Sequence, residues 1–177
     1  LHLSLRRQRQ MCIRDRVWLA PSEWLGATAA EKWPLHLLTN QPRHRLHSQL
    51  DPAALSRAGK IQGCEPIAMH PDDAAARQIR DGDRVRVFNA RGACLAGVKL
   101  DTGLMPGVVV MATGAWSDPD GDLDRHGNPN TLTADIGTSR LAQGPSAQTA
   151  LVQVERYLEP AVAHRAWESP AIARSGL

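Results

Sequence analysis

Two stretches of the sequence are dense in side chains that donate and accept hydrogen bonds. One is TNQPRHRLHSQ (39–49), and the other is GNPNTLTADIGTSRLAQGPSAQT (127–149). Neutral amides offer a donor and an acceptor at fixed geometry, which suits the edge of a heterocycle such as a guanine or a pterin. Arg45 and exposed backbone N–H groups could hold a diphosphate, and glycines allow close backbone approach. The alternative is that both stretches are surface loops capped by their own side chains.

A row of carboxylates in the second half of the chain could bind calcium. The stretch DPDGDLD carries Asp118, Asp120, Asp122 and Asp124. An EF-hand also needs a glutamate at its twelfth position and a helix on each side, and this sequence has neither. The pattern therefore favours a solvated turn over a calcium site.

Other catalytic signatures are also missing from the sequence. No zinc-binding spacing relates the candidate histidines His36, His44, His47, His70 and His126. The cysteines are too few and too widely spaced for a disulfide framework or a supported thiol nucleophile; they are Cys12, Cys64 and Cys94. We therefore predict no catalytic residue and no metal ligand in this chain, and we assign Cys94 to the core.

The elements that must position the two polar stretches are mostly short strands. RVRVFN (84–89) alternates polar and apolar residues, which predicts a half-buried strand, and a tight turn leads into a second strand at 93–100. Further strands are predicted at 33–39, 65–70, 108–114 and 150–158. Close turns around buried β-branched runs favour a compact barrel over an open parallel sheet.

Two short helices are predicted between these strands. The first spans 51–59 with Asp51 as its N-cap, and the second spans 71–79. Residues 115–145 show no sustained period and are predicted to form a long polar loop. Loops of this length in compact domains usually carry function.

The positive charge of the chain lies at one end. The net charge of the 177 residues is +3, and residues 1–16 alone contribute +4, so residues 17–177 net to −1. Because the body of the protein is not basic, nucleic acid and anionic membranes are poor candidate partners. No run approaches the roughly 18 apolar residues that cross a bilayer, so we predict no membrane insertion.

The chain divides into three predicted segments. Residues 1–16 lack apolar periodicity and contain MCIRDR, which resembles translated sequencing-adapter DNA; we interpret them as a non-native or disordered basic segment. Residues 17–159 are expected to form one domain. The Pro- and Ala-rich residues 160–177 are expected to form a loose tail.

Four longer stretches resemble a known family. They are WPLHLLTNQPRHRLHSQLD, EPIAMHPDDAAARQIRDGDRVRVFNARG, HGNPNTLTADIGTSRLAQG and AQTALVQVE. They are similar to the C-terminal domain of molybdopterin oxidoreductases, above all the dimethyl sulfoxide, trimethylamine N-oxide and biotin sulfoxide reductases. The resemblance implies a mainly β fold, a six-stranded double-psi β-barrel with short helices of the aspartate-decarboxylase-like type. It also implies binding of a bis(molybdopterin guanine dinucleotide) molybdenum cofactor.

The resemblance further implies which side chains contact that cofactor. The first polar stretch would contribute Gln41, Arg45, His47 and Ser48, and the second would contribute Asn130, Gln148 and Thr149. Trp116 is a secondary candidate, expected near the funnel to the metal. The other secondary candidates, which could instead brace their own loop, are Asp135, Thr138, Ser139 and Gln143. Pro145 departs from the family pattern, because a small or polar residue is expected there. Both stretches are expected to fold onto one rim of the barrel and share the ligand.

In this family, a serine that binds the metal lies in an earlier domain. We therefore expect the chain to be the C-terminal fragment of a longer S-oxide or N-oxide reductase and to be inactive alone. Its partners would be the remaining domains and a small oxide substrate, in either the cytoplasm or the periplasm. The alternative is a stand-alone barrel that binds a nucleotide or another small ligand without a redox role. A nucleic-acid binder would depend on residues 1–16.

Overall fold

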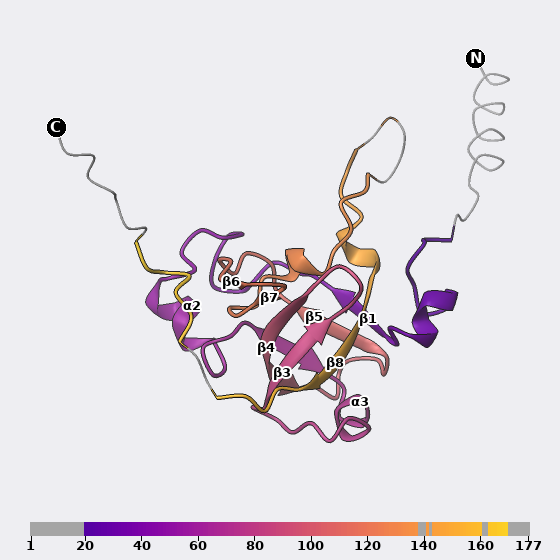
Figure 1. Cartoon of the computed structure of the whole chain (residues 1–177), viewed down its shortest axis with the longest axis horizontal. Helices are drawn as coiled ribbons and strands as arrows, with labels where there is room; N and C mark the ends of the chain where they lie inside the picture. Colours follow the sequence, from indigo (N-terminus) through magenta and orange to yellow (C-terminus); the bar gives the residue numbers. More distant parts are fainter. Residues whose placement is uncertain (1–19, 138–140, 142, 161–162, 170–177) are drawn as a thin grey trace, which may run out of the picture.

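Six strands close into a mixed β-barrel in the computed structural model, which describes residues 20–137, 141, 143–160 and 163–169 (Figure 1). The strands are β1 (Leu35–Leu38), β2 (Pro66–Met69), β3 (Arg84–Phe88), β4 (Ala93–Leu100), β5 (Val108–Met111) and β8 (Ala150–Arg156). They neighbour one another in the order β2–β5–β1–β8–β3–β4, and a pairing of β2 with β4 closes the ring. The pairs β1–β5 and β2–β4 are parallel, and the other four are antiparallel. The predicted six-stranded double-psi β-barrel is confirmed.

Short helical segments and a small ribbon surround the barrel. The helical segments in the described part of the chain are η1 (Thr28–Glu31), α2 (Ala54–Ala58), α3 (Pro71–Ala75), η2 (Pro129–Thr131) and η3 (Ala147–Thr149). Strands β6 (Pro119–Asp120) and β7 (Leu123–Asp124) pair with each other, and β7 also pairs with β4. Among the described residues, no helix has the length and apolar character to span a membrane. The predicted basic segment, residues 1–16, lies outside the described residues.

The alternation of each strand directs one set of side chains into the barrel. Leu35 and Leu37 of β1 and Val109 of β5 are at most 1% exposed, while their neighbours along each strand face outward. Burial of each such side chain contributes about 1.5–3 kcal/mol, so this shared interior is the main source of stability. Strand β4 is buried on both faces over six residues. Gly97 contributes to this burial because its lack of a side chain lets another segment lie directly on the strand. A Cβ at Gly97 would overlap Ile61, which lies directly on the strand.

Both predicted helices form, but they are shorter than predicted. Helix α3 begins after His70, whose Nδ1 accepts a hydrogen bond from the N–H of Asp72 at 3.1 Å. Helix α2 begins after Ala53, so the prediction that Asp51 caps this helix is wrong. The Asp51 side chain is fully buried and binds residues far away in the sequence instead.

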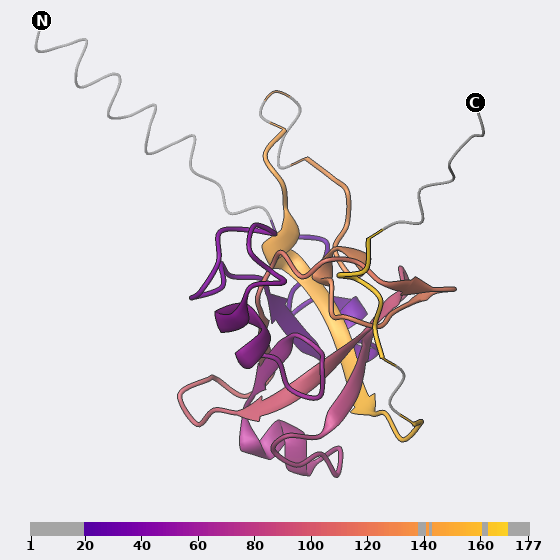
Figure 2. The same cartoon turned by 90° about the vertical axis from the view of Figure 1, so that its left-hand side faces the viewer.

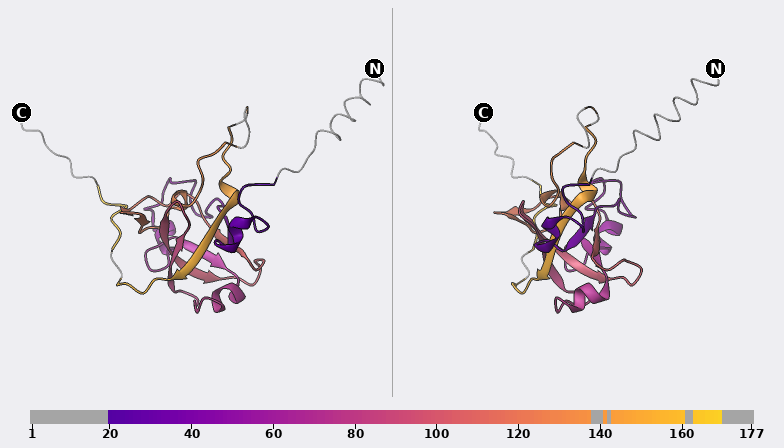
Figure 3. Two further views of the ribbon diagram at one scale, coloured as in Figure 1. Left: turned by 45° about the vertical axis from the view of Figure 1, so that its right-hand side comes forward. Right: turned by 90° about the vertical axis from the view of Figure 1, so that its right-hand side faces the viewer.

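The polar stretches leave the barrel at one end, which we call the loop rim. The strand pairings require this, because β1, β3 and β5 end there while β2, β4 and β8 begin there. The loop rim therefore carries residues 39–65, 89–92 and, as far as the structure describes them, 112–137 and 143–149, whereas the opposite rim carries α3 and residues 101–107 (Figures 1 and 2). Figure 3 shows the same separation from two further sides. Both polar stretches thus lie on one rim.

Residues 163–169, within the segment that we predicted to be loose, pack against the barrel. The N–H of Arg165 donates to Asp118 at 3.0 Å. The Nε1 of Trp167 donates to Asp51, also at 3.0 Å. This part of the tail is therefore held in place, and Trp167 is hydrogen-bonded to the buried Asp51 of the loop rim.

Candidate ligand-binding rim

The end of the second polar stretch is tied to the beginning of the first. The amide Oε1 of Gln148 accepts a hydrogen bond from the N–H of Thr39 at 2.9 Å. The amide Nε2 donates to the carbonyl and the hydroxyl of Thr39 at 2.5 and 3.0 Å. The Gln148 side chain therefore substitutes for a missing strand partner and braces the rim.

The first loop after β1 is held in shape by its own side chains. Gln41 Nε2 lies 2.9 Å from His47 Nδ1 in a hydrogen bond, and the N–H of His47 donates to Gln41 Oε1 at 3.2 Å. His47 itself has a φ of 50°, an unusual conformation that this pairing supports. The predicted ligands Gln41, His47 and Ser48 are all exposed.

A second loop packs directly against the first one. Gly114 has a φ of +88°, and a Cβ at this position would overlap the carbonyl of His47, so only glycine fits here. Trp116 Nε1 donates to the carbonyl of Ser48 at 2.8 Å. The Trp116 side chain remains 40% exposed. The structure thus brings Trp116 beside His47 and Ser48, as one surface.

Arg45 does not reach this surface. Its side chain is 4% exposed, and it donates to Ser56 Oγ at 3.1 Å and to the carbonyl of Thr113 at 2.9 Å. Its Nη2 lies 3.0 Å from Glu65 Oε1. These partners occupy the guanidinium inside the protein, so the geometry does not support the predicted contact of Arg45 with a diphosphate. Arg45 is a structural residue that fixes the first loop.

Arg45 belongs to a buried network of two cations and two carboxylates. Lys60 Nζ lies 2.9 Å from Asp51 Oδ1 and 2.5 Å from Glu65 Oε2. Arg45 bridges the same two acids, with Asp51 Oδ1 at 3.6 Å from its Nε. All four side chains are at most 4% exposed. Each charge has an opposite partner, which a buried charge requires.

Asp51 is the centre of this network. Beyond Lys60, its carboxylate accepts the N–H of Trp116 at 3.1 Å and Trp167 Nε1 at 3.0 Å. Burial alone would raise the pKa of Asp51, but hydrogen bonds from Trp167, Lys60 and Trp116 more than offset it and lower the pKa to about 2. The side chain therefore joins helix α2, the loop after β5 and the C-terminal segment.

The aspartate-rich turn is not fully solvated, which corrects the prediction. Asp118 and Asp124 are 5% and 2% exposed. Asp124 Oδ1 accepts the N–H groups of His126, Gly127 and Asn128 at 2.8–3.1 Å. The carboxylate therefore organises the turn that leads into η2. Across the described residues, no group of three or more His, Cys, Asp and Glu side chains is arranged to hold a metal ion.

Asn130 is presented on the loop rim by this organised segment. Asn128 Oδ1 accepts the N–H of Asn130 at 3.0 Å and so starts η2. Behind it, Asn89 Nδ2 donates to the carbonyls of Leu132 and Leu151 at 2.8 and 3.1 Å, which ties η2 to the beginning of β8. The Asn130 side chain is exposed on this fixed support.

The remaining predicted residues divide into braces and surface groups. Thr149 Oγ1 donates to the carbonyl of Ser146 at 2.7 Å, which is a local brace. Asp135 and Gln143 are exposed on the long loop. The secondary candidates Thr138 and Ser139 lie outside the described residues.

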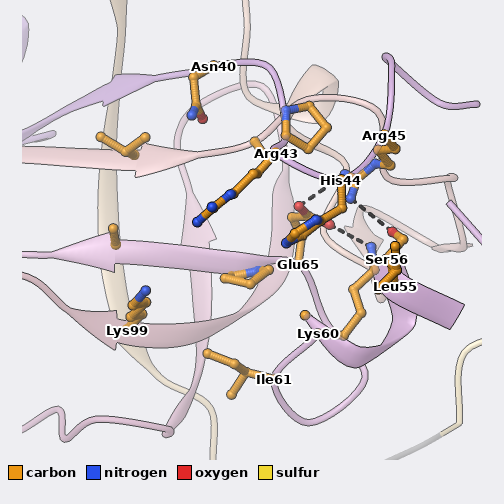
Figure 4. A pocket seen from close by; sticks show the side chains of 16 residues that line it. Asn40, Arg43, His44, Arg45, Leu55, Ser56, Lys60, Ile61, Glu65 and Lys99 are labelled. Carbon is orange, nitrogen blue, oxygen red and sulfur yellow. Dashed lines mark hydrogen bonds and ion pairs between the residues drawn. The ribbon is translucent and has the colours of Figure 1, made fainter. Parts of the chain in front are cut away.

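A cavity of about 430 Å³ beside the first loop was missed at the level of sequence. It lies between residues 40–45 and helix α2, and Figure 4 shows Arg43 extending into it. We call this cavity the basic groove; its polar lining includes Asn40, Arg43, His44 and Lys99. Arg43 belongs to the same polar stretch as Arg45, and Lys99 lies on the outward side of β4. Nothing in the sequence around Arg43 or Lys99 predicts that the two residues line the same cavity.

These features define a class of protein: a small closed β-barrel whose polar loops gather on one rim and are braced there by hydrogen bonds. The model of the Molydopterin dinucleotide binding domain family matches residues 35–151, which contain five of the six barrel strands and both polar stretches. The chain belongs to this family.

The chain is also similar to several proteins that are named as reductases. The chain is 47% identical to "Dimethyl sulfoxide/trimethylamine N-oxide reductase" of Rhodobacter capsulatus over 92% of its length. It is 48% identical to "Biotin sulfoxide reductase" of Cereibacter sphaeroides over 82% of its length, and 50% identical to "Trimethylamine-N-oxide reductase" of Salmonella typhimurium over 76%. The chain spans 17–20% of the length of these three relatives.

A solved structure shares the fold. The acetylene hydratase of Pelobacter acetylenicus superposes with a TM-score of 0.66 over 80% of this chain and 21% of that protein, at 15% identity. At this identity the likeness concerns the fold alone. It agrees with the barrel described above.

Proposed function

We propose that the chain binds a molybdopterin dinucleotide at its loop rim, as part of an S-oxide or N-oxide reductase. Family membership and the names of the relatives support this proposal. The observation that carries it is geometric: two polar stretches far apart in the sequence leave the same rim of one barrel. We take the bound form to be the bis(molybdopterin guanine dinucleotide) molybdenum cofactor.

The exposed groups of the loop rim suit such a ligand. Ser48 and Asn130 offer neutral donors and acceptors for a heterocycle. Trp116, which is 40% exposed, offers an aromatic face. Arg43 is the exposed arginine of the first stretch and takes the place that the sequence suggested for Arg45.

The role of this chain would be to orient the ligand and exclude water from one of its faces. When bound, the molybdenum centre supplies two-electron removal of oxygen from a substrate oxide. We propose that the protein ligand to the metal comes from another domain of a longer reductase, since the chain spans about a fifth of its relatives. The rim residues act through hydrogen bonds and shape, and they need no nucleophile.

Titration of the purified chain with molybdopterin guanine dinucleotide tests this function. Quenching of tryptophan fluorescence would report a saturable Kd. The substitution Asn130→Ala should weaken binding about tenfold, as expected for one lost hydrogen bond. The control Thr102→Ala changes an exposed residue of the opposite rim and should leave the Kd unchanged. No saturable binding, or equal Kd values for the wild type and Asn130→Ala, would contradict the proposal.

A further inference from the structure

The carbonyl of Leu132, at the end of η2, accepts hydrogen bonds from the turn between β3 and β4. Asn89 Nδ2 donates to it at 2.8 Å, and Arg91 donates to it from Nε at 2.9 Å and from Nη2 at 2.7 Å. Leu132 is the C-cap of η2, and its side chain is fully buried. The end of η2 is therefore held from outside this segment, and Arg91 supplies more of the donors than Asn89 does.

Glu23, which lies before η1, fixes the direction of the Arg91 side chain. Glu23 Oε1 accepts from Arg91 Nη1 at 2.5 Å, and Oε2 accepts from Arg91 Nη2 at 2.9 Å. Oε2 also accepts the N–H of Leu151, at the beginning of β8, at 2.8 Å. Burial alone would raise the pKa of Glu23, but hydrogen bonds from Arg91 and Leu151 more than offset it and lower the pKa, so the carboxylate is ionised at neutral pH.

The planar guanidinium of Arg91 makes both contacts because it presents two edges of donors. The Nη1–Nη2 edge meets the carboxylate of Glu23, and the Nε–Nη2 edge meets the carbonyl of Leu132. The side chains of Arg91 and Glu23 are only 31% and 20% exposed. Lysine carries all its donors on one nitrogen and lacks this fork. The substitution Arg91→Lys therefore keeps the charge and removes the rigid link.

The other end of η2 is fixed within its own loop. Asn128 Oδ1 accepts the N–H of Asn130 at 3.0 Å, and Asp124 Oδ1 accepts the N–H of Asn128 at 3.0 Å. Asn130 therefore lies between two anchored residues, Asn128 and Leu132. The first anchor belongs to the same loop, whereas the second depends on the turn between β3 and β4.

We infer that Arg91 is a positioning residue, which holds Asn130 in place for the ligand through the Leu132 carbonyl. Glu23 orients Arg91 for this role. The inference rests on the proposed function, in which Asn130 contacts the dinucleotide. Arg91 has no need to touch the ligand, because Glu23 and Leu132 already engage its Nε, Nη1 and Nη2. A side chain that is ordered before binding spares the complex the cost of ordering it.

A double-mutant cycle with Arg91→Lys and Asn130→Ala, made in the full chain, tests the inference. The readout is the Kd for molybdopterin guanine dinucleotide, measured by quenching of tryptophan fluorescence. Arg91→Lys alone should weaken binding about fivefold, because Asn130 must then be ordered when the ligand binds. In the Asn130→Ala background, the same substitution should change the Kd less than about twofold, because the group that Arg91 positions is gone.

Arg86→Lys is the matched control. Arg86 is also an arginine paired with a glutamate, since its Nη1 lies 2.9 Å from Glu155 Oε1, but it lies in the middle of β3. The control should change the Kd less than about twofold. The two acids form a second matched pair. Glu23→Gln should weaken binding about threefold, because the guanidinium loses its charged partner, whereas Glu155→Gln should leave the Kd unchanged.

Hydrogen exchange of the free chain, followed by mass spectrometry, reports the positioning without any ligand. Peptides that cover residues 128–134 should exchange about tenfold faster in Arg91→Lys than in the wild type, because the end of η2 loses its anchor. Peptides from β1 and β5 should exchange equally in both proteins. Equal exchange at 128–134 would overturn the inference. Faster exchange throughout the barrel would also overturn it, because Arg91 would then support the whole fold.

The outcomes distinguish this inference from the proposed function. If the wild type does not bind the dinucleotide, the proposed function fails. If the wild type binds and Arg91→Lys binds equally well, the positioning role is overturned while the function stands. If Arg91→Lys weakens binding by the same factor with and without the Asn130 side chain, Arg91 does not act through Asn130, and the inference is again overturned.

Discussion

Replacing Asp51 by asparagine removes one charge from the middle of the buried network. Asparagine has nearly the same shape and can still accept hydrogen bonds from the Trp116 N–H and Trp167 Nε1. It cannot balance Lys60, which now lies 2.9 Å from the Asp51 carboxylate. Glu65 would be the remaining acid for both Lys60 and Arg45. The variant therefore isolates the value of one negative charge.

The size of the effect follows from the pKa of Asp51. The folded state lowers this pKa from 3.8 to about 2, which corresponds to about 2 kcal/mol of stability for the ionised form. Loss of balance for the buried cations raises the expected cost of Asp51→Asn to about 3 kcal/mol at pH 7. Because the folded pKa is depressed, the contribution is complete well above pH 4 and is lost as the pH falls through about 2. At pH 3, about half of the pKa-linked part should remain.

Urea unfolding followed by circular dichroism, at pH 7 and pH 3, measures this cost. The difference in unfolding free energy between wild type and Asp51→Asn should shrink by about 1 kcal/mol between the two pH values. Asp72→Asn is the control, since the Asp72 side chain is 83% exposed and should change stability by less than about 0.5 kcal/mol. If Asp51→Asn were as stable as the wild type at pH 7, the network would not hold the rim. A pH-independent difference would refute the role of the Asp51 charge.

Three further predictions concern the rim, the thiols and the activity. Gln148→Ala leaves the buried N–H of Thr39 without its hydrogen-bond partner. The variant should lower the unfolding free energy by about 2 kcal/mol, measured by urea unfolding. An unchanged unfolding free energy would show that the rim closes without this brace. Burial raises the pKa of Cys64 to about 11 and raises the pKa of Cys94 as well. In a Cys12→Ser background, neither thiol should therefore react with Ellman's reagent at pH 8 until urea is added. Rapid reaction of the native protein would contradict this. The isolated chain, assayed with reduced viologen and dimethyl sulfoxide, should show no turnover, because we expect the metal ligand to come from another domain; measurable turnover defeats that expectation.

Local patterns in the sequence predicted the short strands and favoured a compact barrel, while the six-stranded double-psi topology came from the resemblance to a known family. Alternation predicted the strand at 84–89, which forms as β3 at Arg84–Phe88, and the run at 93–100 forms as β4 over the same residues. Such strands are recognisable because the environment of each side chain repeats every second residue. The buried position predicted for Cys94 is confirmed, as its side chain is 0% exposed.

Side chains whose partners are distant in the sequence were not predictable in this way. Asp51 precedes a proline and resembles a helix cap, but its partners Trp116 and Trp167 are 65 and 116 residues away. Arg43 and Arg45 are two residues apart in an irregular loop where no periodicity indicates which side chain turns inward. The pairing of Arg45 with Glu65 decides this, and it depends on the closed barrel.

The buried network constrains how this rim can be exchanged between related proteins. Arg45 enters the network from the loop after β1, and Glu65 enters it from the residue before β2. A new first loop without Arg45, grafted onto this barrel, would leave Glu65 with one cationic partner fewer. A graft that lost Asp51 would also remove the acceptor for the N–H of Trp116, which holds the loop after β5. The segment 45–65 therefore contains all four charged members of the network and would have to be transplanted as one piece, while sequence changes on the rim are best confined to the exposed positions outside this network.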